Sequence, residues 1–579
     1  MQKAEGTCAI CLGAISPDRG EALFTAECSH TFHFLCISAS VKHGNRVCPL
    51  CKSQWKQLPF GGSSSLSFGR RLPPRDSSAP FFPPREPAVF DDDEEPPVNP
   101  PQSDAPSSSS SSNHGPNGTV EMKIYPEFTS VPKASSQEDF AILIHLLAPS
   151  AASPGSAGPA RAPLDLVTVL DVSGSMAGGK IELLKRAMSF VIENLGPSDR
   201  LSVIIFSSSA RRLFGLRRMS VAGQEHALHA VNSLSANGGT NIADGLRKAA
   251  KVIGESRYRN PVRSIILLSD GQDTCRHPSY ESLVPTPTGG DAMTPIHTFG
   301  FGSDHDAAAM HCIAETSGGT FSFVEDESVI QAAFAQCLGG LLSVVVQNIL
   351  VGVQCVHPGV QLTSMESGSY QSRIFDDGQR GSIQVGELYA DEERSFLSLV
   401  KIPPVKTENA ILLIKASCSY TETATQTRVE LNEEELIIQR PKSAGDRKLS
   451  IEVDREKHRV MATKAMTEAK AAAESGELKE AVKILEKEAK ALSRSAARRS
   501  GDAMCVELEG ELKAMTVMMA DRRKYEKRGR AYALSNISSH AQQRAVTNIG
   551  GSGLMRTAYK TRFMDEMVDR SRHSSGNQE

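Results

Sequence analysis

Eight cysteine and histidine residues near the start of the chain are spaced as metal ligands, and this array constrains the fold more than any other feature. It reads C-x2-C-x16-C-x-H-x2-H-x2-C-x11-C-x2-C and comprises Cys8, Cys11, Cys28, His30, His33, Cys36, Cys48 and Cys51. Zinc takes four such ligands in a tetrahedron, and each closely spaced pair supplies two of them from one turn. The array therefore predicts two closed zinc sites in which the metal is structural rather than catalytic. A module this short cannot bury enough apolar surface to fold without them.

The array resembles a RING-H2 zinc finger, the module of many ubiquitin ligases, over residues 8–52. The resemblance implies interleaved sites: zinc site 1 from Cys8, Cys11, His33 and Cys36, and zinc site 2 from Cys28, His30, Cys48 and Cys51. It also implies contacts with a ubiquitin-conjugating enzyme from Ile10, Pro49 and Lys52. Lys52 stands where many active RING fingers carry an arginine, and lysine lacks the planar fork of donors. A zinc fold that only binds another protein is therefore kept as an alternative.

Composition limits the classes of protein to which the chain can belong. The chain has 579 residues and a formal net charge of −3, so no global basic field points to nucleic acid. Residues 1–13 lack the order of a signal peptide, and the apolar stretch 338–353 is short and contains Gln347 and Asn348. We expect no membrane span, and the thiolate-dependent zinc sites indicate a reducing compartment, the cytosol or the nucleus.

A proline-, serine- and acid-rich stretch follows the zinc module. Residues 59–118 include the acidic run 91–95 and an unbroken serine run at 107–112. Such a composition cannot offset the entropy of ordering, so the stretch is predicted to be a disordered linker. The acidic run is interpreted as solvated, with a second interpretation as a built-in ligand for the metal site described next.

Strands and helices alternate from about residue 160 to residue 340. A buried strand at 164–170 is followed by a helix with apolar residues at intervals of three and four. Further strands are expected at 201–206, 264–268, 296–300 and 320–324, with helices at 224–234, 242–253 and 306–316. This alternation is typical of a doubly wound α/β domain with a parallel sheet.

Oxygen-bearing side chains gather where these strands end: Asp171, Ser173, Ser175, Thr240 and Asp270. Two carboxylates and three hydroxyls are hard ligands suited to Mg²⁺. The set resembles the metal site of the von Willebrand factor A domain over residues 160–340, in which a partner protein's carboxylate completes the coordination. The alternative is that these residues only cap strands and helices.

The regions on either side of this domain are predicted to form two further modules. Strand-like runs at 119–158 and 341–440 suggest a β-sandwich into which the A domain is inserted. From 446 to 570 the pattern is helical, with a break at Ser475-Gly476, and the residues from about 571 are expected to be disordered.

The whole arrangement resembles the plant RING and A-domain ligases of the wavy growth family. The resemblance implies a RING-type E3 ubiquitin ligase with a non-covalent mechanism, whose RING recruits a charged conjugating enzyme and whose A domain binds the substrate. It further implies a role in plant growth and root gravitropism. The alternative is a non-catalytic scaffold that binds proteins with the help of zinc and magnesium.

Overall fold

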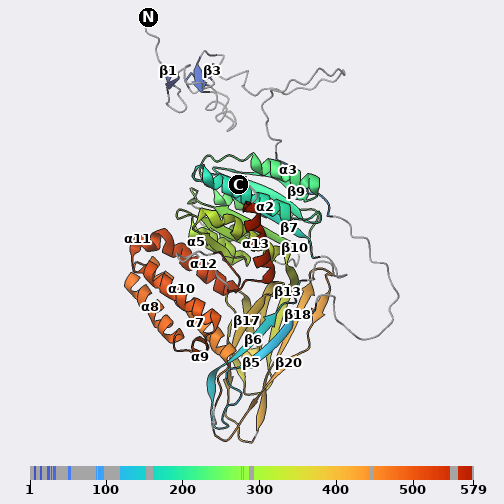
Figure 1. Ribbon diagram of the computed structural model, residues 1–579, viewed down its shortest axis with the longest axis vertical. Helices are drawn as coiled ribbons and strands as arrows, with labels where there is room; N and C mark the ends of the chain where they lie inside the picture. The colour runs from blue at the N-terminus through green and yellow to red at the C-terminus, as the bar shows by residue number, and fades with distance from the viewer. Residues whose placement is uncertain are drawn as a thin grey trace, which may run out of the picture. The chain divides into compact units, whose positions relative to one another are not determined.

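The structure is a computed structural model that describes the chain in two compact units, Met1–Pro84 and Arg85–Glu579. In the first unit the described residues are 6–7, 14–15, 23–25, 28, 30–33, 48, 50, 51 and 53. In the second they are 86–87, 89–96, 118–151, 161–275, 277, 279–285, 293–407, 409–443, 447–547 and 558–576. Figure 1 labels the helices and strands.

Two small antiparallel ladders make up the secondary structure described in the first unit. Strand β1 (Gly6–Thr7) pairs with β2 (Ala14–Ile15), and β3 (Leu23–Thr25) pairs with β4 (Thr31–His33). Phe32, the middle residue of β4, is fully buried. The short β3–β4 hairpin brings two of the predicted ligands, Cys28 and His30, into one turn.

The A domain is a six-stranded sheet in the order β12-β11-β10-β7-β8-β9, with helices on both faces. Neighbouring strands are parallel except for β9, which pairs antiparallel with β8 at the edge. Side chains of β7 alternate between two cores, one beneath α4 and α5 and the other beneath α2 and α6. The strands are β7 (Leu164–Asp171), β8 (Arg200–Phe206), β9 (Ala210–Arg218), β10 (Val262–Ser269), β11 (Ile296–Phe301) and β12 (Phe321–Val324). The helices are α2 (Gly179–Asn194), α3 (Val221–Asn232), α4 (Ile242–Glu255), α5 (Ala307–Ser317) and α6 (Ile330–Leu342).

The doubly wound fold is confirmed, and the edge strand β9 is one of the elements that the pattern missed. Its side chains alternate in burial, but four arginines interrupt the apolar positions of the strand. The sequence therefore lacks the continuous apolar run that marked the central strands. The apolar stretch near residue 340 is a passage from a helix, α6, to a strand, β13. None of the described helices is both long and apolar enough to cross a bilayer.

The β-sandwich is confirmed, and the A domain is inserted between its strands β6 and β13. One sheet has the order β14-β17-β6-β5; the other has the order β15-β16-β13-β18-β19, with β20 also pairing with β18. Apolar side chains from both sheets form one core between them. The strands are β5 (Glu121–Pro126), β6 (Gln137–Leu147), β13 (Val344–Cys355), β14 (Gln361–Glu366), β15 (Gln371–Phe375), β16 (Arg380–Tyr389), β17 (Glu393–Ile402), β18 (Ala410–Glu422), β19 (Arg428–Glu430) and β20 (Glu434–Gln439).

The C-terminal region is helical as predicted, and the break between α7 and α8 falls at Ser475 and Gly476, where glycine adopts a φ of 89°. The expectation of disorder from residue 571 is wrong for residues 571–576, which belong to helix α13. Met564 and Met567 of α13 pack against α6 of the A domain, a contact between distant segments that local composition does not reveal. The elements are α7 (Ile451–Glu474), α8 (Leu478–Leu492), α9 (Ala496–Arg499), α10 (Ala503–Met519), α11 (Arg522–Lys524), the π-helix η6 (Tyr525–Gly529), α12 (Arg530–Gln542) and α13 (Arg562–Gly576).

Arg544 joins the sandwich to the segment after α12. Its guanidinium donates to Glu392 in the turn between β16 and β17 and stacks over the Tyr389 ring at 3.9 Å. Tyr389 packs in turn against Gly340 of α6, where a Cβ would lie 2.4 Å from the ring. A buried arginine needs such a carboxylate partner, so this contact holds three parts of the second unit together.

The predicted disordered linker needs correction at residues 86, 87 and 89–96, which are placed against the A domain. Phe90 is 3% exposed and belongs to the core beneath α4. The acidic residues pair with arginines of the A domain and not with the Asp171 cluster, so the interpretation as a ligand for the metal site is wrong. Composition alone could not reveal partners more than a hundred residues away. Apart from Gly118, the rest of 59–118 lies outside the described residues.

Candidate functional site

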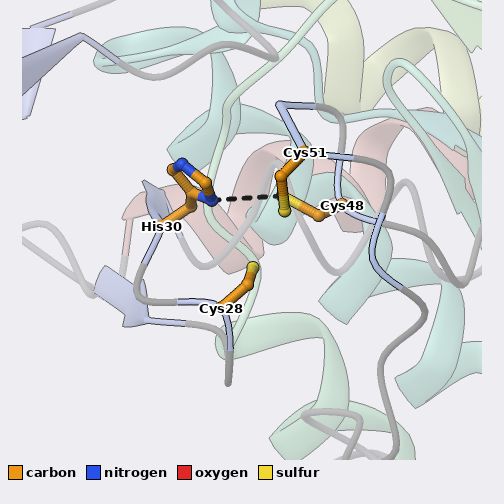
Figure 2. A group of neighbouring side chains, drawn as sticks. All are labelled: Cys28, His30, Cys48 and Cys51. Atoms are coloured by element: carbon orange, nitrogen blue, oxygen red, sulfur yellow. Dashed lines mark hydrogen bonds between the residues drawn. The ribbon is translucent and has the colours of Figure 1, made fainter.

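Four of the eight predicted zinc ligands are described, and they lie together. The ligand atoms of Cys28, His30, Cys48 and Cys51 are all within 4.8 Å of one another, and Figure 2 shows the four side chains converging. His30 Nδ1 lies 3.7 Å from Cys48 Sγ. The hairpin turn supplies the first two ligands, and a turn closed by a hydrogen bond from Cys48 N to Ser53 O, 2.8 Å, supplies the last two.

The electrostatics of this cluster suit a metal that binds thiolates. Hydrogen bonds from the hydroxyl and amide of Ser53 lower the pKa of the Cys51 thiol to about 6. The neighbouring His30 lowers the pKa of Cys28, and Cys28 in turn raises the pKa of His30. Three sulfurs and one imidazole nitrogen are a donor set typical of structural zinc. The residues present therefore fit the ion.

The remaining positions predicted in this module cannot be placed. Cys8, Cys11 and Cys36 of zinc site 1 lie outside the described residues, and of His33 only the backbone, in β4, is described. The predicted contacts with the conjugating enzyme, Ile10, Pro49 and Lys52, also lie outside them.

The five predicted magnesium ligands converge at the carboxyl ends of β7 and β10 and at the loop before α4. Asp171 ends β7. Ser173 directly precedes the short helix η2 (Gly174–Met176), and Ser175 lies within it. A hydrogen bond from Gly174 N to Gly238 O, 3.0 Å, joins this loop to the one that carries Thr240. Asp270 directly follows β10.

Short hydrogen bonds connect the cluster. Asp171 accepts from Ser173 N over 2.8 Å and from the Ser269 hydroxyl over 2.7 Å. Ser173 Oγ lies 2.9 Å from Ser175 Oγ, which donates to Asp270 Oδ1 over 2.6 Å. Both carboxylates are buried, whereas Ser175 is exposed, so the cluster opens to solvent at one side. Burial raises the pKa of Asp171.

The cluster also fits a small cation. A Cβ added at Gly271 would lie 2.9 Å from Thr240 Oγ1 and 3.6 Å from Ser175 Oγ, so the glycine keeps a space between the hydroxyls. Lys180 Nζ lies 2.7 Å from Asp270 Oδ2 and balances one of the two carboxylates. The second carboxylate and the three hydroxyls are hard oxygen donors of the kind that Mg²⁺ takes.

Lys180 and Ser269 were absent from the predicted set. Lys180 lies in the first turn of α2, nine residues after Asp171, and Ser269 is the last residue of β10. Their proximity to the predicted ligands along the chain was a usable signal. Their contacts depend on how the loops fold, which spacing does not specify.

Comparisons with known proteins agree with this architecture. Residues 7–37 match the RING-like zinc finger family, residues 165–336 the von Willebrand factor type A domain, and residues 502–573 the family described as VWA / Hh protein intein-like. A von Willebrand factor type A protein from Catenulispora acidiphila superposes with a TM-score of 0.54 at 18% identity, covering 69% of this chain and 89% of that one. That likeness supports the fold alone.

The first of two relatives carries the identification. E3 ubiquitin-protein ligase WAV3 of Arabidopsis thaliana is 31% identical over 546 residues, which span 83% of this chain and 70% of that protein. The chain belongs to this family of E3 ubiquitin-protein ligases. E3 ubiquitin-protein ligase WAVH1 of the same plant is 30% identical over 435 residues, 69% of this chain and 58% of that protein. This ligase has a RING-like zinc finger before an A domain.

Proposed function

We propose that the zinc module recruits a ubiquitin-conjugating enzyme charged with ubiquitin. Ile10 and Pro49 would contact that enzyme, and Lys52 would supply a positive charge beside ubiquitin. A RING ligase forms no covalent bond to ubiquitin, so its contribution is to hold the thioester where a substrate lysine can attack it. The convergence of Cys28, His30, Cys48 and Cys51 supports this proposal most directly, because it forms one half of the expected zinc framework.

The second part of the proposal concerns zinc stoichiometry. Cys8, Cys11, His33 and Cys36 would hold one Zn²⁺, and the described cluster would hold another. Each ion would then fasten two segments that are distant in the sequence. Both ions are structural, and no step of ubiquitin transfer passes through them.

The A domain would bind the substrate. In this proposal Asp171, Ser173, Ser175, Thr240 and Asp270 hold Mg²⁺, and a carboxylate of the substrate completes the coordination. The opening of the cluster beside the exposed Ser175 supports it, since a partner group must reach the ion from outside. From the resemblance to the wavy growth family, we propose a role in plant growth responses such as root gravitropism, in the cytosol or the nucleus.

The test is ubiquitin transfer in vitro with a panel of conjugating enzymes. We expect autoubiquitination by the full chain with at least one enzyme and its loss in Ile10→Ala. Silence with every enzyme would favour the alternative, a zinc- and magnesium-dependent scaffold without ligase activity, for which the lysine at position 52 is the supporting observation.

Substrate binding is tested separately. Proximity labelling with the Ile10→Ala chain should enrich substrates that it binds but no longer modifies. The same labelling with Ile10→Ala/Asp171→Asn should lose those proteins if the metal site binds them. An unchanged set of labelled proteins would contradict substrate capture through magnesium.

A further inference from the structure

An acidic segment of the chain, residues 86, 87 and 89–96, lies against the edge strand β9 and helix α4, and we call the surface that it covers the groove. On the strand side, Glu94 N donates to Leu216 O over 2.9 Å and Arg218 N donates to Glu94 Oε2 over 3.0 Å. On the helix side, Phe90 N donates to Glu255 Oε2 over 2.8 Å and Lys248 Nζ lies 2.5 Å from Glu86 Oε2. The segment therefore contacts both walls of the groove along its length.

Two side chains of the segment are buried and act as anchors. Phe90 enters the core beneath α4, with the Arg212 guanidinium 4.1 Å and the Lys251 ammonium 4.6 Å from its ring centroid. The Asp93 side chain is 3% exposed and accepts from Arg200 Nη1 over 2.8 Å. It also accepts from the Ser256 hydroxyl and from the amides of residues 257 and 258. A buried aromatic ring and a fully hydrogen-bonded carboxylate are the kinds of group that dominate binding.

The other acidic side chains form a rim. Asp92 receives two parallel hydrogen bonds from Arg212, both 2.7 Å, and Glu94 Oε1 lies 3.2 Å from Arg217 Nε. These carboxylates are 47% and 46% exposed. Exposed pairs contribute little affinity but select charge and register, and salt screens them. The groove thus binds an aromatic residue, Phe90, that is followed two, three and four positions later by carboxylates.

Arg200, which binds Asp93 of the segment, also has partners outside the segment. Arg200 makes a second, bidentate pair with Asp165 of β7, at 2.7 and 2.6 Å, and also donates to Tyr258 O. Loss of the segment would remove the contacts of Arg200 Nη1 with Asp93 and with Glu94 O and would leave its pair with Asp165 in place. Arg200 therefore keeps a carboxylate partner when the occupant of the groove is exchanged.

We propose that this groove is a peptide-docking site for a partner protein that offers an acidic segment led by an aromatic residue. The chain's own segment occupies the site as an intramolecular competitor, so a partner must displace it. Charge complementarity supports this occupant, because Arg200, Arg212, Arg217 and Lys248 all face carboxylates. The site is separate from the Asp171 cluster: Arg200 begins β8, whereas Asp171 ends the neighbouring parallel strand β7.

The test uses the full chain and a labelled synthetic peptide with the sequence of residues 86–96, EPAVFDDDEEP. Phe90→Ala/Asp93→Ala should empty the groove. This variant should bind the peptide at least about ten-fold more tightly than the wild-type chain does, because the wild-type groove is occupied. Adding Arg212→Glu should abolish binding, and a peptide with arginine at the position of Asp92 should restore it. Binding should weaken with salt and should not change when Mg²⁺ is omitted, which separates this site from the proposed substrate site.

Two controls make the result decisive. A scrambled peptide of the same composition should bind the emptied variant no more tightly than it binds the wild-type chain. If the double variant fails to fold, Asp92→Arg weakens the same segment at an exposed position. A folded, emptied variant that binds the native and the scrambled peptide equally would overturn the proposal and leave the segment as a fixed part of the domain.

Discussion

The substitution Asp171→Asn separates metal binding from folding at the proposed magnesium site. The carboxylate accepts one hydrogen bond from Ser173 N and one from the Ser269 hydroxyl. Asparagine keeps the shape and can accept the first bond through its carbonyl oxygen. Its amide can donate to Ser269 Oγ, because a hydroxyl can rotate to accept instead. No buried polar group is left without a partner.

The magnitudes follow from this geometry. Replacing a buried carboxylate by a satisfied amide should change the stability of the metal-free protein by no more than about 1 kcal/mol. With Mg²⁺ at about 100 times its dissociation constant, the wild-type chain should gain about 2.7 kcal/mol, and the variant should gain nothing. The raised pKa of Asp171, which reflects its burial, favours removal of the charge in the absence of metal.

The assay is thermal unfolding of the full chain with and without Mg²⁺, at constant zinc. Asp165→Asn is the matched control, since it makes the same substitution in the same strand but breaks the buried pair with Arg200. That control should cost on the order of 3 kcal/mol and keep the full Mg²⁺ increment. The reasoning is refuted if Asp171→Asn retains the increment or if Asp165→Asn loses it.

Two further predictions concern zinc and pH. Cys51→Ala should lower the zinc content by one ion per chain and abolish ubiquitin transfer. It should leave the unfolding of residues 85–579 unchanged, because they form a separate compact unit. If the variant binds as much zinc as the wild-type chain, the assignment of Cys51 as a ligand is wrong. Burial, reinforced by the positive charge of Arg544, lowers the pKa of His297 to about 3, so its proton binds preferentially to the unfolded chain. Stability should therefore be unaffected by this group above about pH 6.5 and should fall as pH drops from 6.5 towards 3, by at most about 1.4 kcal/mol per unit. His297→Gln should flatten that slope in calorimetry across the range, whereas an unchanged slope would exclude His297 as its source.

Local pattern predicted those parts of the molecule in which neighbours along the chain determine the structure. The strand that ends at Asp171 and the break at Gly476 are examples, since each depends on residues within one element. The four zinc ligands that the structure describes were also predictable, because metal geometry links spacing to chemistry.

The features that the sequence did not predict depend on distant contacts. The acidic segment around Phe90 has the composition of a disordered linker, yet arginines of β8 and β9 stabilise it. Helix α13 is ordered by packing on α6, more than two hundred residues earlier in the chain. Lys180 approaches Asp270 because the loop after β7 folds back on the end of β10. In each case tertiary contacts outweigh local propensity.

The most direct test of the account as a whole is ubiquitin discharge from a charged conjugating enzyme in the presence of the full chain. Ile10→Ala should retain the zinc content and the thermal unfolding of the wild-type chain and should lose stimulation of discharge. Asp171→Asn should stimulate discharge as the wild-type chain does, because the metal site of the A domain takes no part in recruiting the enzyme. Stimulation that persists in Ile10→Ala would contradict recruitment through the zinc module.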